Sequence, residues 1–203
     1  MGYTVTEFKP VGKGRIEIRL EGHAAFWLYA AEARQFSLDK GAELSEEQYR
    51  QIFQLLGKRA TKRAMHLLEQ QERTERQLRE KLAQNDYPQE AIEEAVAYVK
   101  SYHYLDDARY ARTFIRYHQE ERSRMRLEAD LLRRGVPKDI IADSMEQEYA
   151  SDEKEQIRRL LEKKQFSPDT ADQKELQKMY GFLMRKGFRS ADISSVMRNS
   201  DWD

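Results

Sequence analysis

The strongest constraint on the fold is a segment that occurs three times at intervals of about 50 residues. The copies are LREKLAQNDYPQEAIEEAV from Leu78, LEADLLRRGVPKDIIADSM from Leu127 and MYGFLMRKGFRSADISSVM from Met179. Apolar residues coincide in all three copies without an insertion or a deletion. The matching sets are Leu78/Leu127/Met179, Leu82/Leu131/Leu183, Tyr87/Val136/Phe188, Ile92/Ile141/Ile193 and Val96/Met145/Met197. The chain is therefore predicted to contain three similar units.

Each copy reads as two helices joined by a turn. QND, RRG and RKG stand where the first helix ends, and Asn, Asp and Gly suit the left-handed backbone needed there. An apolar residue follows, and Pro88 and Pro137 can then open the next helix. A further helical stretch precedes each pair: KRATKRAMHLLEQQ, DARYARTFIRYHQEE and DEKEQIRRLLEKKQ. The unit is thus three helices, and tandem units that contact mainly their neighbours favour an elongated or curved body.

The N-terminal segment has a different pattern. YTVTEF and RIEIRL alternate with the two-residue period of strands, and KPVGKG between them predicts a tight turn. AAFWLYA is a candidate third strand, and Ile16, Ile18 and Leu20 are predicted to form the buried face. SEEQ then forms a capping box at Ser45, which opens a helix that Gly57 is expected to end.

These patterns predict a mainly α protein. Three tandem three-helix repeats form an elongated curved body, preceded by a small N-terminal β-hairpin or sheet element. The predicted boundaries are 1–44 for the β element, 45–57 for a connecting helix, and 58–105, 106–150 and 151–203 for helical repeats 1, 2 and 3.

Composition excludes several classes of function. The 36 basic and 36 acidic side chains cancel, so contact with a polyanion must come from local patches and not from net charge. The chain has no cysteine, which excludes disulfides and thiolate chemistry. No apolar run approaches the roughly 20 residues that span a bilayer, and the N-terminus lacks a signal-peptide core. We therefore expect a cytoplasmic protein without membrane contact.

The adjacent acids Asp106 and Asp107 raise the question of catalysis or metal binding, with His103 as a third ligand. Neighbouring residues on a helix point about 100° apart, so the two carboxylates cannot share a face there. Asp106 stands where Asp favours the N-cap, and Asp107 would interact favourably with the positive helix end. Thr74 and Ser123 are predicted to be caps of the same kind. Helix capping is the favoured interpretation, with a metal-dependent enzyme as the alternative.

Arginines on the helix after Asp106 form a regular stripe. Arg109, Arg112 and Arg116 share one face, while Tyr110, Phe114 and Tyr117 are predicted to pack inward on another. More basic residues follow closely: Arg122, Arg124, Arg126, Arg133 and Arg134. Arginine suits forked contacts to phosphate or carboxylate. These residues predict a surface for a polyanion or an acidic protein, although solvated helix faces would give a similar pattern.

Four segments together resemble the RecX family of bacterial recombination regulators. They are LDKGAELSEEQ (38–48), RTERQLREKL (73–82), YLDDARYARTFI (104–115) and LLRRGVPKDII (131–141). The resemblance covers nearly the whole chain. The third repeat matches least well, because Arg189 replaces the proline of the other two turns and the QFSPDTADQKEL connection is longer.

This resemblance implies a non-enzymatic modulator of the RecA recombinase, with no catalytic residues, metal or cofactor. Such a protein would bind the RecA–single-stranded-DNA filament as a monomer and restrain ATP hydrolysis, strand exchange and filament growth. Direct contact with single-stranded DNA is left open, as is the choice between capping the filament and lying in its groove. The candidate contact residues are Arg109, Arg112, Arg116, Arg124, Arg126, Arg133 and Arg134, with Arg73, Arg76 and Lys81 second. The alternative is a stand-alone DNA-binding protein of helix-turn-helix type.

Overall fold

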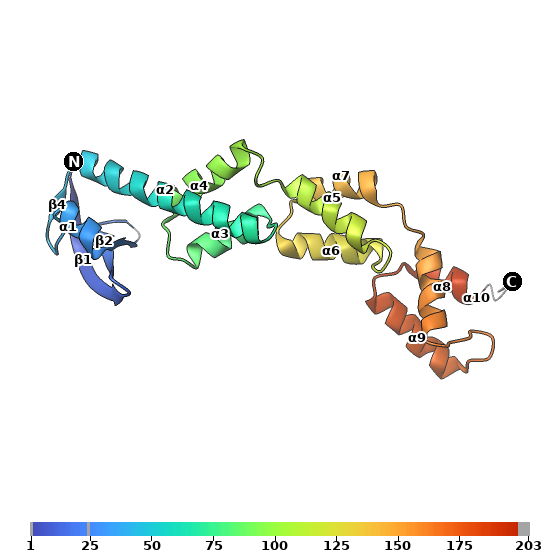
Figure 1. Ribbon diagram of the computed structural model, residues 1–203. Helices are drawn as coiled ribbons and strands as arrows, with labels where there is room; N and C mark the ends of the chain where they lie inside the picture. Colours follow the sequence, from blue (N-terminus) through green and yellow to red (C-terminus); the bar gives the residue numbers. More distant parts are fainter. Residues whose placement is uncertain (1, 24, 199–203) are drawn as a thin grey trace. The chain divides into compact units, whose positions relative to one another are not determined.

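In a computed structural model, which describes residues 2–23 and 25–198, the chain divides into two compact units. Unit 1 is Met1–Asp106 and unit 2 is Asp107–Asp203. The described residues form ten helices and one small sheet, with the sheet in unit 1 (Figure 1). The predicted fold class, mainly α with tandem helical repeats after a small N-terminal sheet, is confirmed.

The sheet has four antiparallel strands in the order β3-β2-β1-β4. They are β1 (Tyr3–Gly12), β2 (Arg15–Leu20), β3 (Phe26–Tyr29) and β4 (Glu43–Leu44). Ile18 and Leu20 are fully buried as predicted, and Ile16 packs at the edge of the same core. The predicted turn KPVGKG is shorter than expected, because β1 continues to Gly12 and only Lys13 and Gly14 lie outside the strands.

Two short elements were absent from the sequence prediction. Helix α1 (Ala30–Gln35) follows β3 directly, and β4 comes between α1 and the next helix. A two-residue strand is too short to show an alternating pattern, and one and a half turns of helix barely show a period of 3.6. Strand β4 nevertheless pairs with Tyr3 and Thr4 of β1, and just before β4 Val5 N–H donates to Ala42 O and Gly41 N–H donates to Val5 O, both at 2.9 Å.

Helix α2 (Glu46–Gln70) begins at the predicted capping box, where the Ser45 hydroxyl accepts from Gln48 N–H at 3.2 Å. The predicted end at Gly57 is wrong, because the helix continues without a break to Gln70. Gly57 is buried where helix α4 crosses, and a methyl group there would overlap the carboxyl group of Glu94. This glycine accommodates a close side chain and does not end the helix. Residues 45–57 are therefore not a separate helix.

The sheet packs on the first half of α2 through aromatic rings. Tyr3 stacks on Tyr49 with ring centroids 4.2 Å apart, and Phe26 meets Phe53 edge-on at 5.4 Å. Trp27 donates its indole N–H to Asn85 O at 3.2 Å, which joins the sheet to the turn of the first repeat. Unit 1 therefore has one core that includes the sheet and the first three helices of the repeat array.

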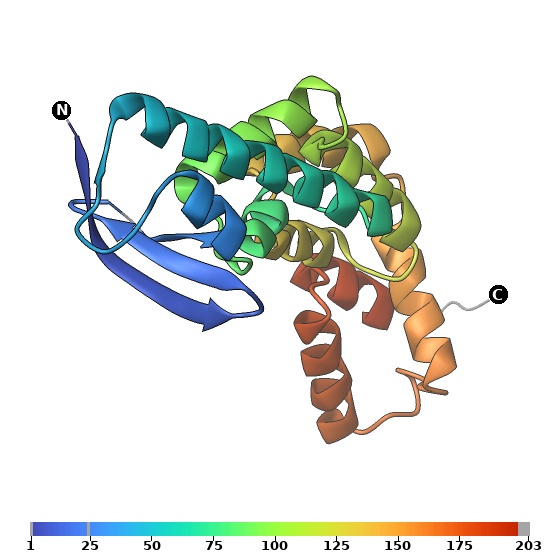
Figure 2. The same cartoon turned by 60° about the vertical axis from the view of Figure 1, so that its left-hand side comes forward.

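Each of the three repeats consists of three helices, although the first helix of the first repeat is about twice as long as its counterparts. In unit 1, α2 lies along α4, and α3 completes the repeat (Figure 2). Unit 2 contains the second repeat (α5 to α7) and the third (α8 to α10). The bounds are α3 (Glu75–Ala83), α4 (Gln89–Ser101), α5 (Asp107–His118), α6 (Arg124–Arg134), α7 (Lys138–Glu148), α8 (Glu153–Lys163), α9 (Gln173–Arg185) and α10 (Ser190–Arg198).

The turn inside each repeat has the predicted left-handed residue. Asp86, Gly135 and Gly187 have φ values of 60°, 91° and 89°. In all three repeats the next residue's N–H donates to the carbonyl five residues earlier, which closes the helix end. These bonds are Tyr87 to Leu82 (3.4 Å), Val136 to Leu131 (3.1 Å) and Phe188 to Leu183 (3.3 Å). The same type of turn therefore joins the second and third helices of every repeat.

The repeated apolar positions form the cores of the repeats. In the second repeat Leu127, Leu131 and Met145 are completely buried, and Leu183 and Ile193 are completely buried in the third. One aromatic prediction is wrong: Tyr117 is 79% exposed, although Phe114 is buried. The buried face of α5 is centred on Ala111 and Ile115, so Tyr117 lies on the flank of the helix near its end.

Candidate functional site

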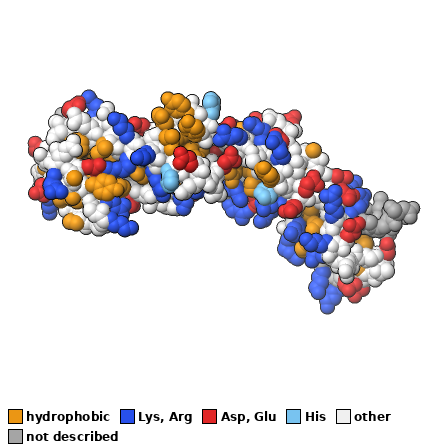
Figure 3. Space-filling view, in the orientation of Figure 1, with side chains coloured by type: hydrophobic (Ala, Val, Ile, Leu, Met, Phe, Trp, Pro, Cys, Tyr) orange, Lys and Arg blue, Asp and Glu red, His pale blue; other side chains and the backbone are white. Residues whose placement is uncertain are grey.

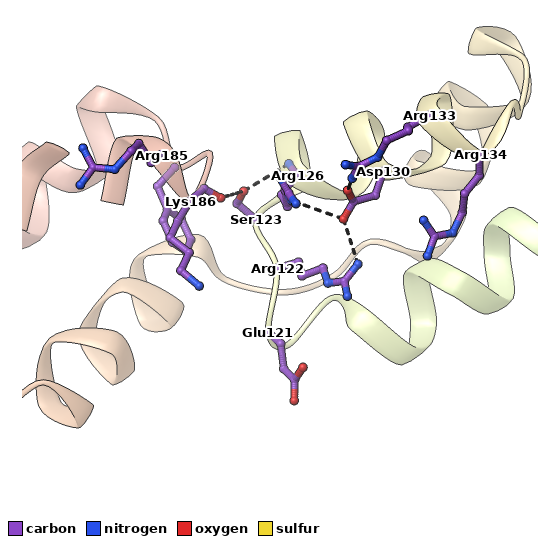
Figure 4. Close-up of a pocket in the computed structure, with 10 residues that line it drawn as sticks. Glu121, Arg122, Ser123, Arg126, Asp130, Arg133, Arg134, Arg185 and Lys186 are labelled. Carbon is purple, nitrogen blue, oxygen red and sulfur yellow. Dashed lines mark hydrogen bonds and ion pairs between the residues drawn. The ribbon is translucent and has the colours of Figure 1, made fainter. Parts of the chain in front are cut away.

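A pocket of about 570 Å³ with mainly basic walls lies in unit 2. Its walls come from α6, from the loop before α6 and from the turn between α9 and α10 (Figure 4). We call it the basic pocket, and it is lined by Glu121, Arg122, Ser123, Arg126, Asp130, Arg133, Arg134, Arg185, Lys186 and Phe188. Lys and Arg side chains gather over α6 in Figure 3.

The N-terminus of α6 positions the pocket. Ser123 is 1% exposed, and its hydroxyl accepts from Arg126 N–H at 3.3 Å, as its predicted capping role requires. The same hydroxyl donates to Lys186 O at 2.9 Å. Gly187 allows this approach, because a Cβ atom there would lie 2.7 Å from the Ser123 hydroxyl. One cap therefore fixes the second repeat against the turn of the third.

A buried carboxylate organises the arginines. The Asp130 side chain is 3% exposed and accepts from Arg122 Nη1 at 2.9 Å, with Arg126 Nε at 3.4 Å and Arg133 also paired to it. Figure 4 shows the three guanidinium groups converging on Asp130 from different directions. One negative charge faces three positive charges, so the group keeps an excess of positive charge that an outside anion can balance.

The remaining walls add to this excess. Arg134 donates to the Tyr110 hydroxyl at 3.1 Å, and its guanidinium carbon lies 4.6 Å from the Phe114 ring centroid. These two neutral aromatic side chains position the guanidinium group without neutralising its charge. Arg185 and Lys186 contribute two more cations. Glu121 is the other acid of the pocket, and its carboxylate points away from Asp130 in Figure 4. Arginine forks beside a helix N-terminus are suited to phosphate or carboxylate groups.

His118 lies beside these cations at the end of α5. Its ring centroid is 4.5 Å from that of Phe114. Burial lowers the pKa of His118 below its ordinary value of 6.5, and the nearby charges of Arg122 and Arg134 lower it further. The imidazole is therefore mostly neutral at neutral pH and adds a positive charge only in more acidic solution.

Three of the predicted contact residues line the basic pocket: Arg126, Arg133 and Arg134. Arg124 lies outside it, because its guanidinium pairs with Glu128 at 3.1 Å and its backbone N–H donates to Glu153 at 2.7 Å.

The arginine stripe of α5 lies opposite the buried face of that helix, as predicted. It consists of Arg109, Arg112 and Arg116. Arg116 makes a two-pronged contact with Glu148 on α7, at 2.8 and 3.2 Å. This contact raises the pKa of the Arg116 guanidinium, which remains charged. The stripe is not among the residues that line the pocket.

The second-rank candidates belong to unit 1. Arg73 Nε donates to Leu67 O at 3.4 Å, and Arg76 Nε lies 3.5 Å from a carboxylate oxygen of Glu80. Lys81 donates to the Gln84 side chain at 3.0 Å. These three residues do not line the basic pocket of unit 2, and they remain candidates for filament contact on the basis of the sequence.

Sequence reasoning proposed no role for three of the cations that line the pocket. Arg185 and Lys186 were missed although the repeat contains the signal, because they align with Arg133 and Arg134. Arg122 was noted among the basic residues but was not proposed as a contact. The first repeat has Gln84 and Asn85 at the aligned positions, so the basic pair is a property of the second and third repeats.

Asp106 and Asp107, the possible catalytic or metal-binding acids, lie at the start of a helix. Helix α5 begins at Asp107, so Asp106 directly precedes it and Asp107 lies in its first turn. Across residues 2–23 and 25–198, no cluster of three or more His, Asp or Glu side chains is arranged to hold a metal ion. Within the same residues, no helix is long and apolar enough to cross a membrane.

Family models and individual relatives identify the same protein family. Models for the first, second and third three-helix domains of RecX match residues 60–99, 106–145 and 152–197. A regulatory protein RecX of Caldanaerobacter subterraneus is 33% identical over 90% of this chain and 92% of its own length, and one of Clostridium beijerinckii is 26% identical over 96% and 93%.

Solved structures show the same fold. A crystal structure of regulatory protein RecX has a TM-score of 0.66 and 25% identity, and covers 97% of this chain and all of its own. The structure of RecX from Lactobacillus salivarius has a TM-score of 0.61 at 18% identity, over 73% of this chain and 98% of its own. Sequence models, relatives and fold agree over most of the chain, and the protein belongs to the RecX family.

Proposed function

We propose that this protein binds the RecA–single-stranded-DNA filament and inhibits or modulates its ATPase activity, strand exchange and growth. It acts in the cytoplasm as a monomeric, non-enzymatic regulator that needs no cofactor. Membership of a family whose curated members are named regulatory proteins supports this role.

The observation that carries the proposal is the basic pocket. Six cations and two carboxylates line it, and Asp130 holds three of those cations around one buried point. A chain with balanced total charge gains little long-range attraction to DNA, so a local site must supply contact with a charged filament. The pocket provides that site, with phosphate or the carboxylates of RecA as its partners.

The residues proposed for filament contact fall into two ranks. Arg126, Arg133 and Arg134 come first because they line the pocket, and Arg122, Arg185 and Lys186 join them. The earlier candidates outside the pocket are proposed as additional contacts: Arg109, Arg112, Arg116, Arg124, Arg73, Arg76 and Lys81.

The test is the ATPase activity of RecA on single-stranded DNA while this protein is titrated in. We expect the rate to fall in a saturable way at a protein-to-RecA ratio below one, since each bound molecule would affect neighbouring protomers. No change in rate at a ratio where co-sedimentation shows the filament saturated would refute regulation of ATPase activity.

A gel-shift experiment without RecA separates this function from that of a stand-alone helix-turn-helix DNA-binding protein. The proposed function predicts that duplex DNA shifts weakly at physiological salt and that the shift disappears steeply as salt rises. Tight binding to duplex DNA at physiological salt, together with an unchanged RecA ATPase rate, would favour the stand-alone protein.

A further inference from the structure

Three tyrosines form an exposed group at the C-terminal end of α4. Tyr98, Tyr102 and Tyr104 are 43%, 57% and 51% exposed, and we call them the tyrosine cluster. The ring centroids of Tyr98 and Tyr102 are 4.8 Å apart, and those of Tyr102 and Tyr104 are 6.1 Å apart with the planes 20° from parallel. Figure 3 shows hydrophobic side chains gathered over this end of α4.

The backbone holds the cluster in place. Val99, which follows Tyr98, and Leu105, which follows Tyr104, are buried in the core of unit 1, which anchors the segment. His103 has a φ of 57°, and the N–H groups of His103 and Tyr104 donate back to α4 carbonyls at 2.9 Å. This left-handed turn brings Tyr104 back toward Tyr102. The rings are therefore displayed on an ordered support and not on a loose loop.

The tyrosine cluster has no role in the core of unit 1. On α4 the buried residues are Ala91, Ile92, Ala95, Val96 and Val99, whereas Tyr98 is exposed on the same helix and Tyr102, directly after the helix, is exposed too. Adjacent exposed aromatic rings are costly to hydrate, and contiguous exposed apolar groups of this kind commonly mark interaction sites. Each of the three side chains thus keeps a large exposed surface at this end of α4.

The charged residues of α3 and α4 favour a protein, and not a nucleic acid, as the binding partner of the tyrosine cluster. Lys100 Nζ donates to Glu75 at 2.7 Å, and Arg79 makes a two-pronged contact with Glu93 at 2.8 and 2.9 Å, so these cations are already balanced. Proteins that stack bases of single-stranded nucleic acid combine aromatic rings with an excess of positive charge, which is lacking here.

We propose that the tyrosine cluster docks on a protein surface of the RecA filament that presents arginine and aliphatic side chains. This inference rests on the proposed function and adds a second contact, in unit 1, to the basic pocket of unit 2. Tyrosine is enriched in the energetically dominant part of protein interfaces, because a rigid ring buries much area at low entropic cost. A guanidinium group can also stack on the exposed ring faces.

The experiment uses the full chain with Tyr98→Ser and Tyr102→Ser combined. Affinity is measured by co-sedimentation with RecA filaments assembled on single-stranded DNA, and by anisotropy of a fluorescein-labelled oligo(dT) without RecA. Tyr117→Ser is the matched control, since Tyr117 is 79% exposed and lies outside the cluster. The pair Tyr98→Phe and Tyr102→Phe keeps the rings and should retain the affinity. Circular dichroism confirms that each variant is folded.

The serine pair is expected to weaken filament binding by at least about tenfold, with oligo(dT) binding unchanged and the control within about twofold. Three results would overturn the proposal: retained filament affinity, an equal loss on bare oligo(dT), which would assign the cluster to nucleobases, or a dimer in sedimentation that the serine pair abolishes. Wild-type protein that binds no filament would refute the proposed function as well, whereas binding that the serine pair retains would refute this proposal alone.

Discussion

Arg122 Nη1 lies 2.9 Å from Asp130 Oδ2, and the carboxylate that it contacts is 3% exposed. Arg126 and Arg133 approach the same carboxylate, so three guanidinium groups are collected around one buried acid. A buried acid with a surplus of cations serves as an internal anchor, because it fixes the arginines while leaving most of their charge for another anion. Asp130 thereby connects the folding of α6 to the chemistry of the basic pocket.

Replacing this anchor tests its structural role. Asp130→Asn keeps the shape but removes the charge, and the three arginines then repel one another. We expect the free energy of unfolding to fall by about 1–3 kcal/mol, less than for a fully buried ion pair because the arginines reach solvent. Urea denaturation followed by circular dichroism measures it. Glu128→Gln, which breaks the exposed Arg124 pair, is the control and should change stability by less than about 0.5 kcal/mol.

Substitutions at Gly57 test whether this glycine is needed for space or for backbone freedom. A methyl group there meets only the flexible end of the exposed Glu94 side chain, which can turn into solvent. Gly57→Ala should therefore leave the protein folded and raise the free energy of unfolding by up to about 1 kcal/mol, since alanine favours the helix. Gly57→Leu should lower it by about 1–3 kcal/mol, because a large side chain forces α2 and α4 apart. If alanine destabilises the protein as much as leucine does, this account of the helix crossing is wrong.

The lowered pKa of His118 gives stability a dependence on pH. The folded pKa lies below 6.5, so in the window just below pH 6.5 the unfolded chain binds more protons than the folded one. Stability from the neutral imidazole is therefore present above pH 6.5 and is lost as the pH falls toward the folded pKa. His118→Gln should lose less stability between pH 7.5 and 5.5 than the wild type does, as urea midpoints at the two pH values would show. Identical pH dependence in both proteins would contradict this assignment.

The arginine stripe of α5 is tested by the pair Arg112→Glu and Arg116→Glu. The change reverses two charges on an exposed helix face, so helicity should persist, although the contact between Arg116 and Glu148 is lost. If the stripe contacts the filament, inhibition of RecA ATPase should fall by at least about tenfold in half-inhibitory concentration. Inhibition that persists at wild-type concentrations would remove the stripe from the interface.

The sequence was sufficient to predict the repeats, because their apolar spacing and turn chemistry are local. Each left-handed residue lies within the triplet predicted to contain it, and the caps at Ser45, Thr74 and Ser123 were as expected. Gly57 was misread because a glycine that ends a helix and one that admits a neighbouring side chain look alike in sequence. The difference lies in a contact with Glu94, far along the chain.

The basic pocket could be predicted only in part. Arg126, Arg133 and Arg134 were candidates because they cluster in sequence, but Arg185 and Lys186 reach the same pocket by tertiary packing. That packing includes the hydrogen bond from Ser123 to Lys186 O and uses the space left by Gly187. Ion pairs such as Arg124 with Glu128 decide which arginines of a helix turn toward the pocket. The positions of charged residues in the sequence do not reveal these pairs.

The most direct test of the central claim is the RecA ATPase rate on single-stranded DNA with the pocket variant Arg126→Glu and Arg133→Glu titrated against the wild type. Lys174→Glu with Lys178→Glu makes the same charge change on the exposed face of α9, outside the pocket, and serves as the matched control. The account predicts that the pocket variant, folded by circular dichroism, needs at least about tenfold more protein for half-inhibition while the control behaves as the wild type does. Equal inhibition by all three proteins would contradict it.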